Sequence, residues 1–285
     1  MSTTTSDHLL TDVLDELIDV RPFPATASSV MAACDKPDVT AGDLSDIIAQ
    51  DPALSMKLLQ IANSPMYGFG GQIQSVQHAA VLIGLRALKN LAVSMAMGEV
   101  FGSGGPLTAN ARDQLWEHAL ACGSIARTIA AKTGLGVPDE AFLGGIVHDV
   151  GKLIFVDHRP EEFMSLQGAD CSRKKLEAET EAFGITHTAV GRECGENWGL
   201  PDELSDIITF HHNPEDSDFG SELIDIVFAA NKLTRLWCTD DPPESCGTTC
   251  DVLTAANIDL SPEEVEDLKH QATTDLAAMQ EAHSS

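Results

Sequence analysis

The sequence has few basic residues, and this shortage excludes several classes of partner. It contains 17 Lys and Arg against 44 Asp and Glu, which gives a formal net charge of −27 at pH 7. Such a field repels nucleic acid and anionic membranes, because both carry dense negative charge. We therefore expect neither as a partner, and a nucleotide ligand would need a local positive site. An acid-rich surface also suits salt-rich surroundings, which says nothing about partners.

Aromatic residues, long apolar runs and strand patterns are also scarce. Aromatic residues make up 5% of the chain, so Ala, Leu, Ile, Val and Met must form most of the core. That mixture favours helices over strands. No apolar run approaches the roughly 20 residues that span a bilayer, and neither alternating strand patterns nor repeats are evident. The sequence predicts an all-α fold.

The seven cysteines contain no Cys-x-x-Cys pair. The loosely spaced Cys238, Cys246 and Cys250 have no histidine nearby, which argues against a zinc site. An odd number of cysteines without an N-terminal apolar signal segment is typical of reduced thiols in the cytoplasm. We therefore expect a soluble, cytoplasmic protein.

Helix starts and turn-rich segments divide the chain. Residues 1–14 form a polar N-terminal segment, and LLTDVLDELIDV at 9–20 suggests a short leading helix. Thr40 with Asp43 is typical of a helix start, as is Asp51 before a proline. A long apolar pattern from Ser75 predicts two helices that meet near a glycine at position 84.

GSGGPLTAN, residues 102–110, is a candidate hinge after an N-terminal helical part of the chain. Residues 241–285 are expected to form a loop and then a capped, acidic, exposed helix. Between them the apolar patterns predict helices at 112–132, 139–157, about 172–183, 187–198, 201–212 and 221–238.

The segment FLGGIVHDVGK, residues 142–152, places ionisable side chains among apolar ones. If it is helical, Lys152 lies on the same side as His148 and Asp149, from which it is four and three residues away. Because an unpaired buried charge is costly, this cluster favours a functional site over core filling.

Three glycines surround that cluster, at positions 144, 145 and 151. Each costs a helix about 1 kcal/mol relative to alanine. Their presence indicates the close approach of another helix or a ligand.

Other histidines lie at His118, His187, His211 and His212. Imidazole and carboxylate suit Fe, Mn, Ni and Zn, and a two-metal site can clamp an in-line phosphoryl transfer. Taken alone, however, each histidine is more often a hydrogen-bonded core or surface residue than a ligand.

The order of these histidines resembles the HD superfamily of metal-dependent phosphohydrolases. More specifically, the chain resembles the HDOD domain, the HD-related output domain of bacterial signalling proteins, over roughly residues 15–240. The resemblance is carried by FPATASSVMAACDKPDVTAGDLSDIIAQDPALSMKLLQIANSPMYG, QSVQHAAVLIGLRALKNLAVSMAM, FLGGIVHDVGKLIF and NWGLPDELSDIITFHHNP. It implies a multi-helix HD-like bundle, with an N-terminal helical lobe at 15–101 and an HD-like core at 112–240.

The resemblance also implies roles for the clustered residues. One or two divalent transition-metal ions (Fe, Mn, Ni or Zn) would be bound by His118, His148, Asp149, His187, His211 and His212. Asp149 and Lys152 would be the catalytic residues, with Lys152 in contact with a phosphate.

Two departures from the family patterns weaken the case for catalysis. Asn231 stands where the superfamily has its last aspartate ligand, and an amide carries no charge to offset a cation. Asp225 lies six residues earlier, about 600° around the helix, so we do not expect it to substitute. The Gly-Tyr-Pro signature of relatives that cleave cyclic di-GMP is absent, because HHNPED follows the paired histidines instead.

Two functions remain open. The first is a bacterial signal-output module that acts through protein–protein contacts, with signalling proteins or a second copy as partners, a nucleotide as one class of ligand, and weak or no catalysis. The second is a metal-dependent phosphohydrolase, a phosphodiesterase acting on nucleotides or cyclic nucleotides. An exposed apolar patch on the N-terminal lobe would favour the module, whereas converging ligands with an open coordination position would favour the enzyme.

Overall fold

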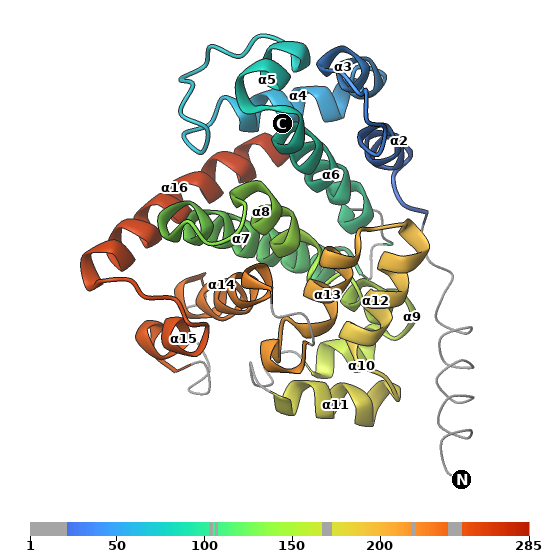
Figure 1. Cartoon of the computed structure of the whole chain (residues 1–285). Helices are drawn as coiled ribbons and strands as arrows, with labels where there is room; N and C mark the ends of the chain where they lie inside the picture. Colours follow the sequence, from blue (N-terminus) through green and yellow to red (C-terminus); the bar gives the residue numbers. More distant parts are fainter. Residues whose placement is uncertain are drawn as a thin grey trace.

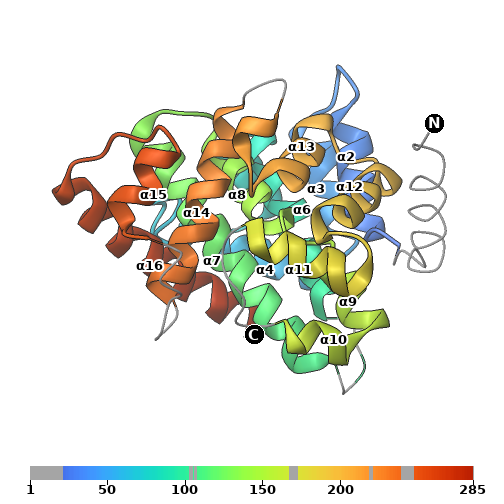
Figure 2. The same ribbon diagram turned by 90° about the horizontal axis from the view of Figure 1, so that it is seen from below.

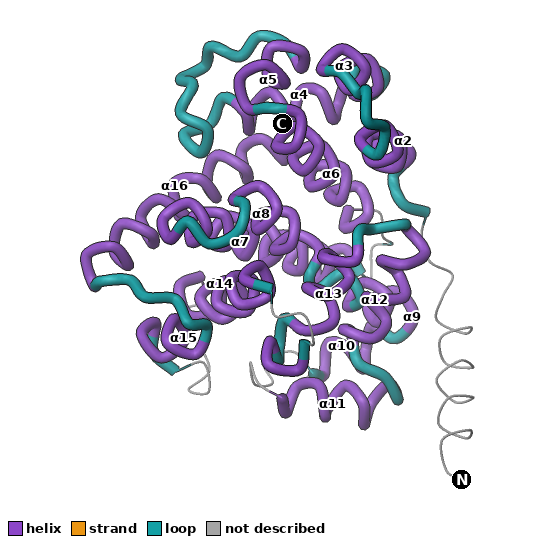
Figure 3. The backbone as a smooth tube through the Cα atoms, in the orientation of Figure 1, coloured by secondary structure: helices purple, strands orange, loops and turns teal. Residues whose placement is uncertain are grey.

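A computed structural model describes residues 22–102, 105, 108–166, 173–217, 221–238 and 247–284. Within these ranges the structure is helical and contains no strand (Figure 3), so the predicted all-α fold is confirmed. No helix in this part of the chain is both long and apolar enough to cross a membrane. The leading helix expected at 9–20 lies outside the described residues, as do four positions of the candidate hinge.

The first helices form a layer that we call the N-terminal lobe, at the top of Figure 1. It comprises α2 (Ala25–Cys34), α3 (Ala41–Ile48), α4 (Pro52–Ala62), α5 (Val76–Ile83) and α6 (Leu85–Gly102). The expected helix starts are confirmed, because Thr40 and Asp43 form a capping box and Asp51 accepts a hydrogen bond from the Leu54 amide. Gly84, with a φ of 88°, separates α5 from α6 as predicted.

The remaining helices pack around α7, the long helix at the centre of Figures 1 and 2. Helix α7 contacts α6 of the lobe as well as α8, α14 and α16. One hydrophobic cluster therefore runs from the lobe to the C-terminal helix. The helices are α7 (Ala109–Thr133), α8 (Pro138–Val147), α9 (Lys152–His158), α10 (Pro160–Ser165), α11 (Arg173–Phe183), α12 (His187–Trp198), α13 (Asp202–Phe210), the 3₁₀ helix η1 (Pro214–Asp216), α14 (Glu222–Cys238), α15 (Thr249–Ala255) and α16 (Pro262–Ser284).

The prediction of a single helix at 139–157 is wrong, because the chain turns between α8 and α9. The turn brings Gly151 against the backbone of α12. A Cβ at Gly151 would lie 2.0 Å from the His187 carbonyl oxygen and 2.6 Å from the Gly191 nitrogen. The turn therefore positions two segments that both carry histidines.

Glycines also permit the closest contact between α7 and α8, as the sequence predicted. A Cβ at Gly145 would lie 2.5 Å from the Cα of Gly123 and 2.6 Å from its nitrogen. At Gly144 it would lie 2.9 Å from Cδ1 of Ile207 on α13. The glycines therefore allow neighbouring helices to pack closely against α8.

The C-terminal helix is capped as expected, since the Ser261 hydroxyl accepts from the Glu264 amide. Its expected exposure is wrong, because one face packs on α7 and buries Leu268, Ala272 and Met279. The Ser124 hydroxyl of α7 also donates a hydrogen bond to the Ala272 carbonyl, 2.9 Å away. The apolar residues of this helix are mostly small and stand among many charged ones, so their periodic signal is weak.

We predict that Gly145→Ala destabilises the protein by about 1–3 kcal/mol or more, because the added methyl group meets backbone that cannot rotate away. The matched control is Gly102→Ala at the end of α6, where a Cβ would meet no atom within 4 Å. This control should change stability by no more than about 0.5 kcal/mol. Urea denaturation monitored by circular dichroism measures both, and equal stability of the two variants would contradict the proposed contact.

Candidate metal centre

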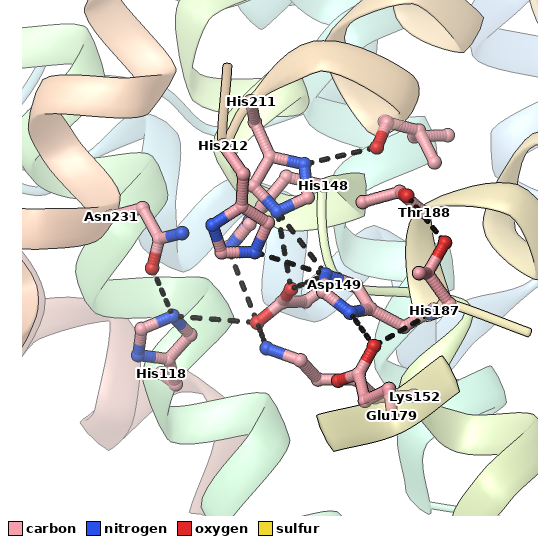
Figure 4. Close-up of polar contacts among 12 residues, drawn as sticks. His118, His148, Asp149, Lys152, Glu179, His187, Thr188, His211, His212 and Asn231 are labelled. Carbon is pink, nitrogen blue, oxygen red and sulfur yellow. Dashed lines mark hydrogen bonds and ion pairs between the residues drawn. The ribbon is translucent and has the colours of Figure 1, made fainter. Parts of the chain in front are cut away.

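The structure brings all the sequence-predicted site residues into one cluster (Figure 4). His118 lies in the middle of α7, and the turn after α8 supplies His148 and Asp149. The other members come from the starts of α9 and α12, the turn after α13, and α14: Lys152, His187, His211, His212 and Asn231. Six parts of the chain therefore converge on the site.

The possible ligand atoms form two groups that share Asp149. In the first group, atoms of Asp149, His187, His211 and His212 all lie within 4.8 Å of one another. The second group contains His118, His148 and Asp149 within the same distance. The carboxylate lies between them and belongs to both.

The two oxygens of Asp149 face different groups. Oδ1 lies 3.2 Å from Nε2 of His187 and 3.5 Å from Nε2 of His211. Oδ2 lies 3.3 Å from Nε2 of His148 and 3.6 Å from Nε2 of His118. A carboxylate placed in this way can bridge two cation positions.

Hydrogen bonds hold the three most buried imidazoles with Nε2 toward the cluster. The Nδ1 of His148 contacts the Gly145 carbonyl at 2.8 Å, and that of His211 contacts the Ile208 carbonyl at 3.0 Å. The Nδ1 of His187 contacts Glu179 Oε2 at 2.6 Å. Because all three partners are acceptors, each Nδ1 donates a hydrogen bond, and each ring is held with its Nε2 toward the cluster.

Several inward-facing atoms lack a suitable protein partner. The buried His148 Nε2 and Asp149 Oδ1 have no hydrogen-bond partner among the described residues. The Nε2 of His187 lies 3.2 Å from Nε2 of His212 and 3.4 Å from Nε2 of His211. A cation in either group would be in reach of several of these nitrogen and oxygen atoms at once, so the cluster is able to hold a metal ion.

The electrostatics keep Asp149 ionised and His211 neutral, whereas His148 holds a proton that a metal ion would have to displace. Burial opposes ionisation of Asp149, but the charges of His148 and Lys152 hold its pKa well below the ordinary value. Burial lowers the pKa of His211 to about 3, so this ring is neutral. Burial also opposes a charge on His148, yet Asp149 raises its pKa to about 10. In the metal-free site, a proton on His148 therefore provides the positive charge.

Lys152 is 2% exposed and pairs with Oδ2 of Asp149. The ion pair compensates for burial of both charges, which explains how an ammonium group is accommodated in the core. A phosphate contact for Lys152 remains a prediction.

Asn231 lies where the resemblance expected a carboxylate. Its Oδ1 is 3.1 Å from Nε2 of His118, so this amide extends the second group (Figure 4). Asp225 belongs to neither group of possible metal ligands. The second group is therefore completed by a neutral oxygen.

Glu179 was missed by the sequence analysis. This buried residue of α11 accepts hydrogen bonds from both Nδ1 and the backbone nitrogen of His187. Burial would raise its pKa, but the neighbouring His187 and its hydrogen bonds lower it to about 2. A spacing of eight residues across a turn does not match any known ligand motif. Only the structure therefore reveals the contact between Glu179 and His187.

The described part of the site is most exposed at His118 and His212. The His118 side chain is 18% exposed and His212 is half-buried, whereas His148, Asp149 and His187 are no more than 1% exposed. A ligand would therefore approach past His118 and His212.

We predict that Glu179→Gln weakens metal binding by about 10–100-fold, because a neutral amide orients and polarises His187 less well. Glu181→Gln is the matched control, since Glu181 lies exposed on the same helix. Competition with a chromogenic chelator measures both affinities. Equal affinities for the two variants would show that Glu179 does not support the metal ligand.

Comparison with known proteins identifies the family of the chain. The HDOD domain model matches residues 20–214. An uncharacterized protein of Treponema pallidum (strain Nichols) is 29% identical over 245 residues, which are 85% of this chain and 47% of the relative. The chain thus spans about half the length of that protein.

Solved structures share the fold over nearly the whole chain. An HDOD domain protein of unknown function from Geobacter sulfurreducens has a TM-score of 0.75 and 25% identity, covering 98% of this chain and 97% of its own. A protein of Shewanella amazonensis SB2B, named as a candidate metal-dependent phosphohydrolase, has a TM-score of 0.73 and 21% identity, covering 97% and 98%.

A third structure, named as a candidate signal transduction protein of Marinobacter aquaeolei VT8, has a TM-score of 0.73 and 22% identity, covering 99% of this chain and 66% of its own. The likenesses to the Shewanella and Marinobacter proteins concern the fold alone. The family model spans the lobe and every predicted histidine ligand. The chain belongs to the HDOD domain family.

Proposed function

We propose that this chain is a bacterial signal-output module that acts through protein–protein contacts and whose HD-type centre binds metal with little or no turnover. The observation that carries this proposal is the inequality of the two ligand groups. One group offers three imidazoles and a carboxylate. The other offers two imidazoles and the same carboxylate, with the neutral Asn231 amide beside them.

The inequality bears directly on phosphate-ester cleavage. Two metal ions stabilise an in-line displacement by offsetting charge on both the attacking and the leaving oxygen. The second position has Asp149 as its only carboxylate, and that charge is shared with the first position and with Lys152. A second divalent ion would therefore be weakly held, which favours binding over catalysis.

The donor set also limits the identity of the metal. Three imidazoles and one carboxylate form the four-residue group, with no thiolate. This combination suits Fe, Mn, Ni or Zn rather than Mg or Ca, which prefer oxygen ligands.

Exposed apolar side chains on the N-terminal lobe support a role in protein contacts. Met56 of α4 is 60% exposed, and on α5 Val81 is 72% and Leu82 38% exposed. Helices α4 and α5 contact one another, so these side chains belong to one part of the lobe. Exposed apolar surface of this kind is typical of interaction sites, with a signalling protein or a second copy as the partner.

The second candidate is a phosphodiesterase acting on nucleotides or cyclic nucleotides, favoured by the retained His118, His148 and Asp149 and by Lys152. When bound, metal would supply Lewis-acid chemistry at the phosphorus atom. The chain itself would contribute Lys152, whose ammonium would hold a phosphate oxygen, and the opening past His118 and His212 would admit the ester. This candidate predicts substantial turnover despite Asn231.

We predict that the wild-type protein holds about one tightly bound ion per chain and that Asn231→Asp raises this to about two, since the carboxylate supplies the missing charge. The wild type should hydrolyse bis(p-nitrophenyl) phosphate no more than about tenfold faster than Asp149→Ala, whereas Asn231→Asp should be faster still. Metal analysis by mass spectrometry and the colorimetric assay, with Fe, Mn, Ni and Zn in turn, measure both quantities.

A wild-type protein with two tight ions and turnover far above that of Asp149→Ala would replace the output module with the phosphodiesterase. Metal-free wild type that stays metal-free on titration would remove the metal centre from both proposals.

A further inference from the structure

A second candidate site lies away from the metal centre, where the N-terminal lobe meets the helices around α7. A cavity of about 160 Å³ is lined by residues of α2, α6, α8 and α14 and by the start of α13. None of the residues of the metal cluster lines it. It is therefore independent of the proposed metal site.

The inner wall of this cavity carries a buried donor without an acceptor. Asn90 of α6 lines the cavity and is 1% exposed, and its Nδ2 has no hydrogen-bond partner among the described residues. A buried amide donor that has lost its contact with water and has no acceptor destabilises the fold. A ligand atom that accepts a hydrogen bond from Asn90 would remove this destabilisation.

A positive charge lies next to that donor in the sequence and in the cavity wall. Lys89 is half-buried, lines the cavity and forms no ion pair with a carboxylate of the described residues. The other cation, Arg86, pairs with Glu140 through its Nε at 2.7 Å, so these two charges offset each other. Glu203 also lines the cavity, but it is exposed to solvent, which screens its charge. The half-buried charge without a carboxylate partner among the described residues is thus that of Lys89.

The rest of the cavity wall is apolar, with Met31, Val93, Leu143, Leu204 and Leu223 contributed by both parts of the molecule. The volume is close to that of an engineered cavity of about 150 Å³ that binds benzene. An apolar body about the size of one aromatic ring therefore fits, whereas a nucleotide does not.

We propose that this cavity binds a small organic monoanion, with its apolar body between the lobe and the α7 helices and its carboxylate on Lys89 and Asn90. The site goes beyond the metal-centred function and does not depend on it. Because a bound molecule would touch both parts of the chain, its binding free energy would stabilise their packing. Binding in the cavity would thus regulate the domain independently of the metal centre.

Three probes with the same ring separate the contributions of shape and charge: benzoate, benzyl alcohol and benzylamine. Titration of uniformly labelled protein, followed by ¹H–¹⁵N NMR at physiological salt, measures their affinities and maps the shifted signals. We expect benzoate to bind at least about tenfold more tightly than the other two, with the side-chain amide of Asn90 among the signals that shift. The net charge of −27 opposes this preference, so the comparison is stringent.

Two variants locate the site. Lys89→Met should weaken benzoate binding at least about tenfold while leaving benzyl alcohol unchanged, because only the charge is lost. Lys57→Met is the matched control, since Lys57 is also half-buried in the lobe but does not line the cavity. Both variants keep an apolar stem, and thermal unfolding checks that they fold.

Failure of all three probes to bind the wild type at millimolar concentration would overturn the proposal, leaving a water-filled cavity. Equal affinities for benzoate and benzylamine, or equal losses in Lys89→Met and Lys57→Met, would also overturn it. These outcomes leave the metal content unaffected, so they are distinguishable from failure of the proposed function.

Discussion

The carboxylate of Asp149 lies buried among four imidazoles, and the structure around it compensates for its charge. His187 and His211 face one oxygen, while His148, His118 and Lys152 face the other. Burial destabilises an ionised carboxylate, so Asp149 stays ionised only while cations or hydrogen-bond donors surround it. A metal ion would satisfy the same need, because the Nε2 atoms of these imidazoles already point toward the carboxylate.

The fold supplies this arrangement through backbone contacts. Gly123 and Gly145 let α7 and α8 approach so closely that His118 lies near the end of α8. The turn at His148–Gly151 lies equally close to the backbone of α12, whose first residue is His187. Since these contacts involve backbone atoms, they allow little sliding, and the ligands are positioned before any ion arrives. Such preorganisation suits both a stable bound metal and a site that signals its occupancy.

The helix starts and the close packing around His148 could be predicted from the sequence, because they depend on residues near one another in the chain. The capping residues Thr40 and Asp51 determine helix starts within one turn, and the glycines around His148 indicate close packing. The histidine set could be recognised only by resemblance to a family, since separations of 24 to 39 residues carry no physical signal by themselves.

What could not be predicted depends on how segments meet in space. Glu179 contacts His187 across the turn between α11 and α12, and Gly151 at the α8–α9 turn lies against the backbone of α12. The buried face of α16 and the orphaned amide of Asn90 likewise arise from helices distant in the chain. A periodic pattern shows which face is apolar, but not which helix will cover it.

The measurement that tests the metal centre most directly is X-ray absorption spectroscopy of the metal-loaded protein. The structure predicts a first shell of about three imidazole nitrogens and one carboxylate oxygen at about 2.0–2.2 Å for zinc, with the outer-shell scattering of histidine rings. A shell of oxygen atoms without imidazole scattering, or one that contains sulfur, would show that the ion is not bound at Asp149 and would contradict the account.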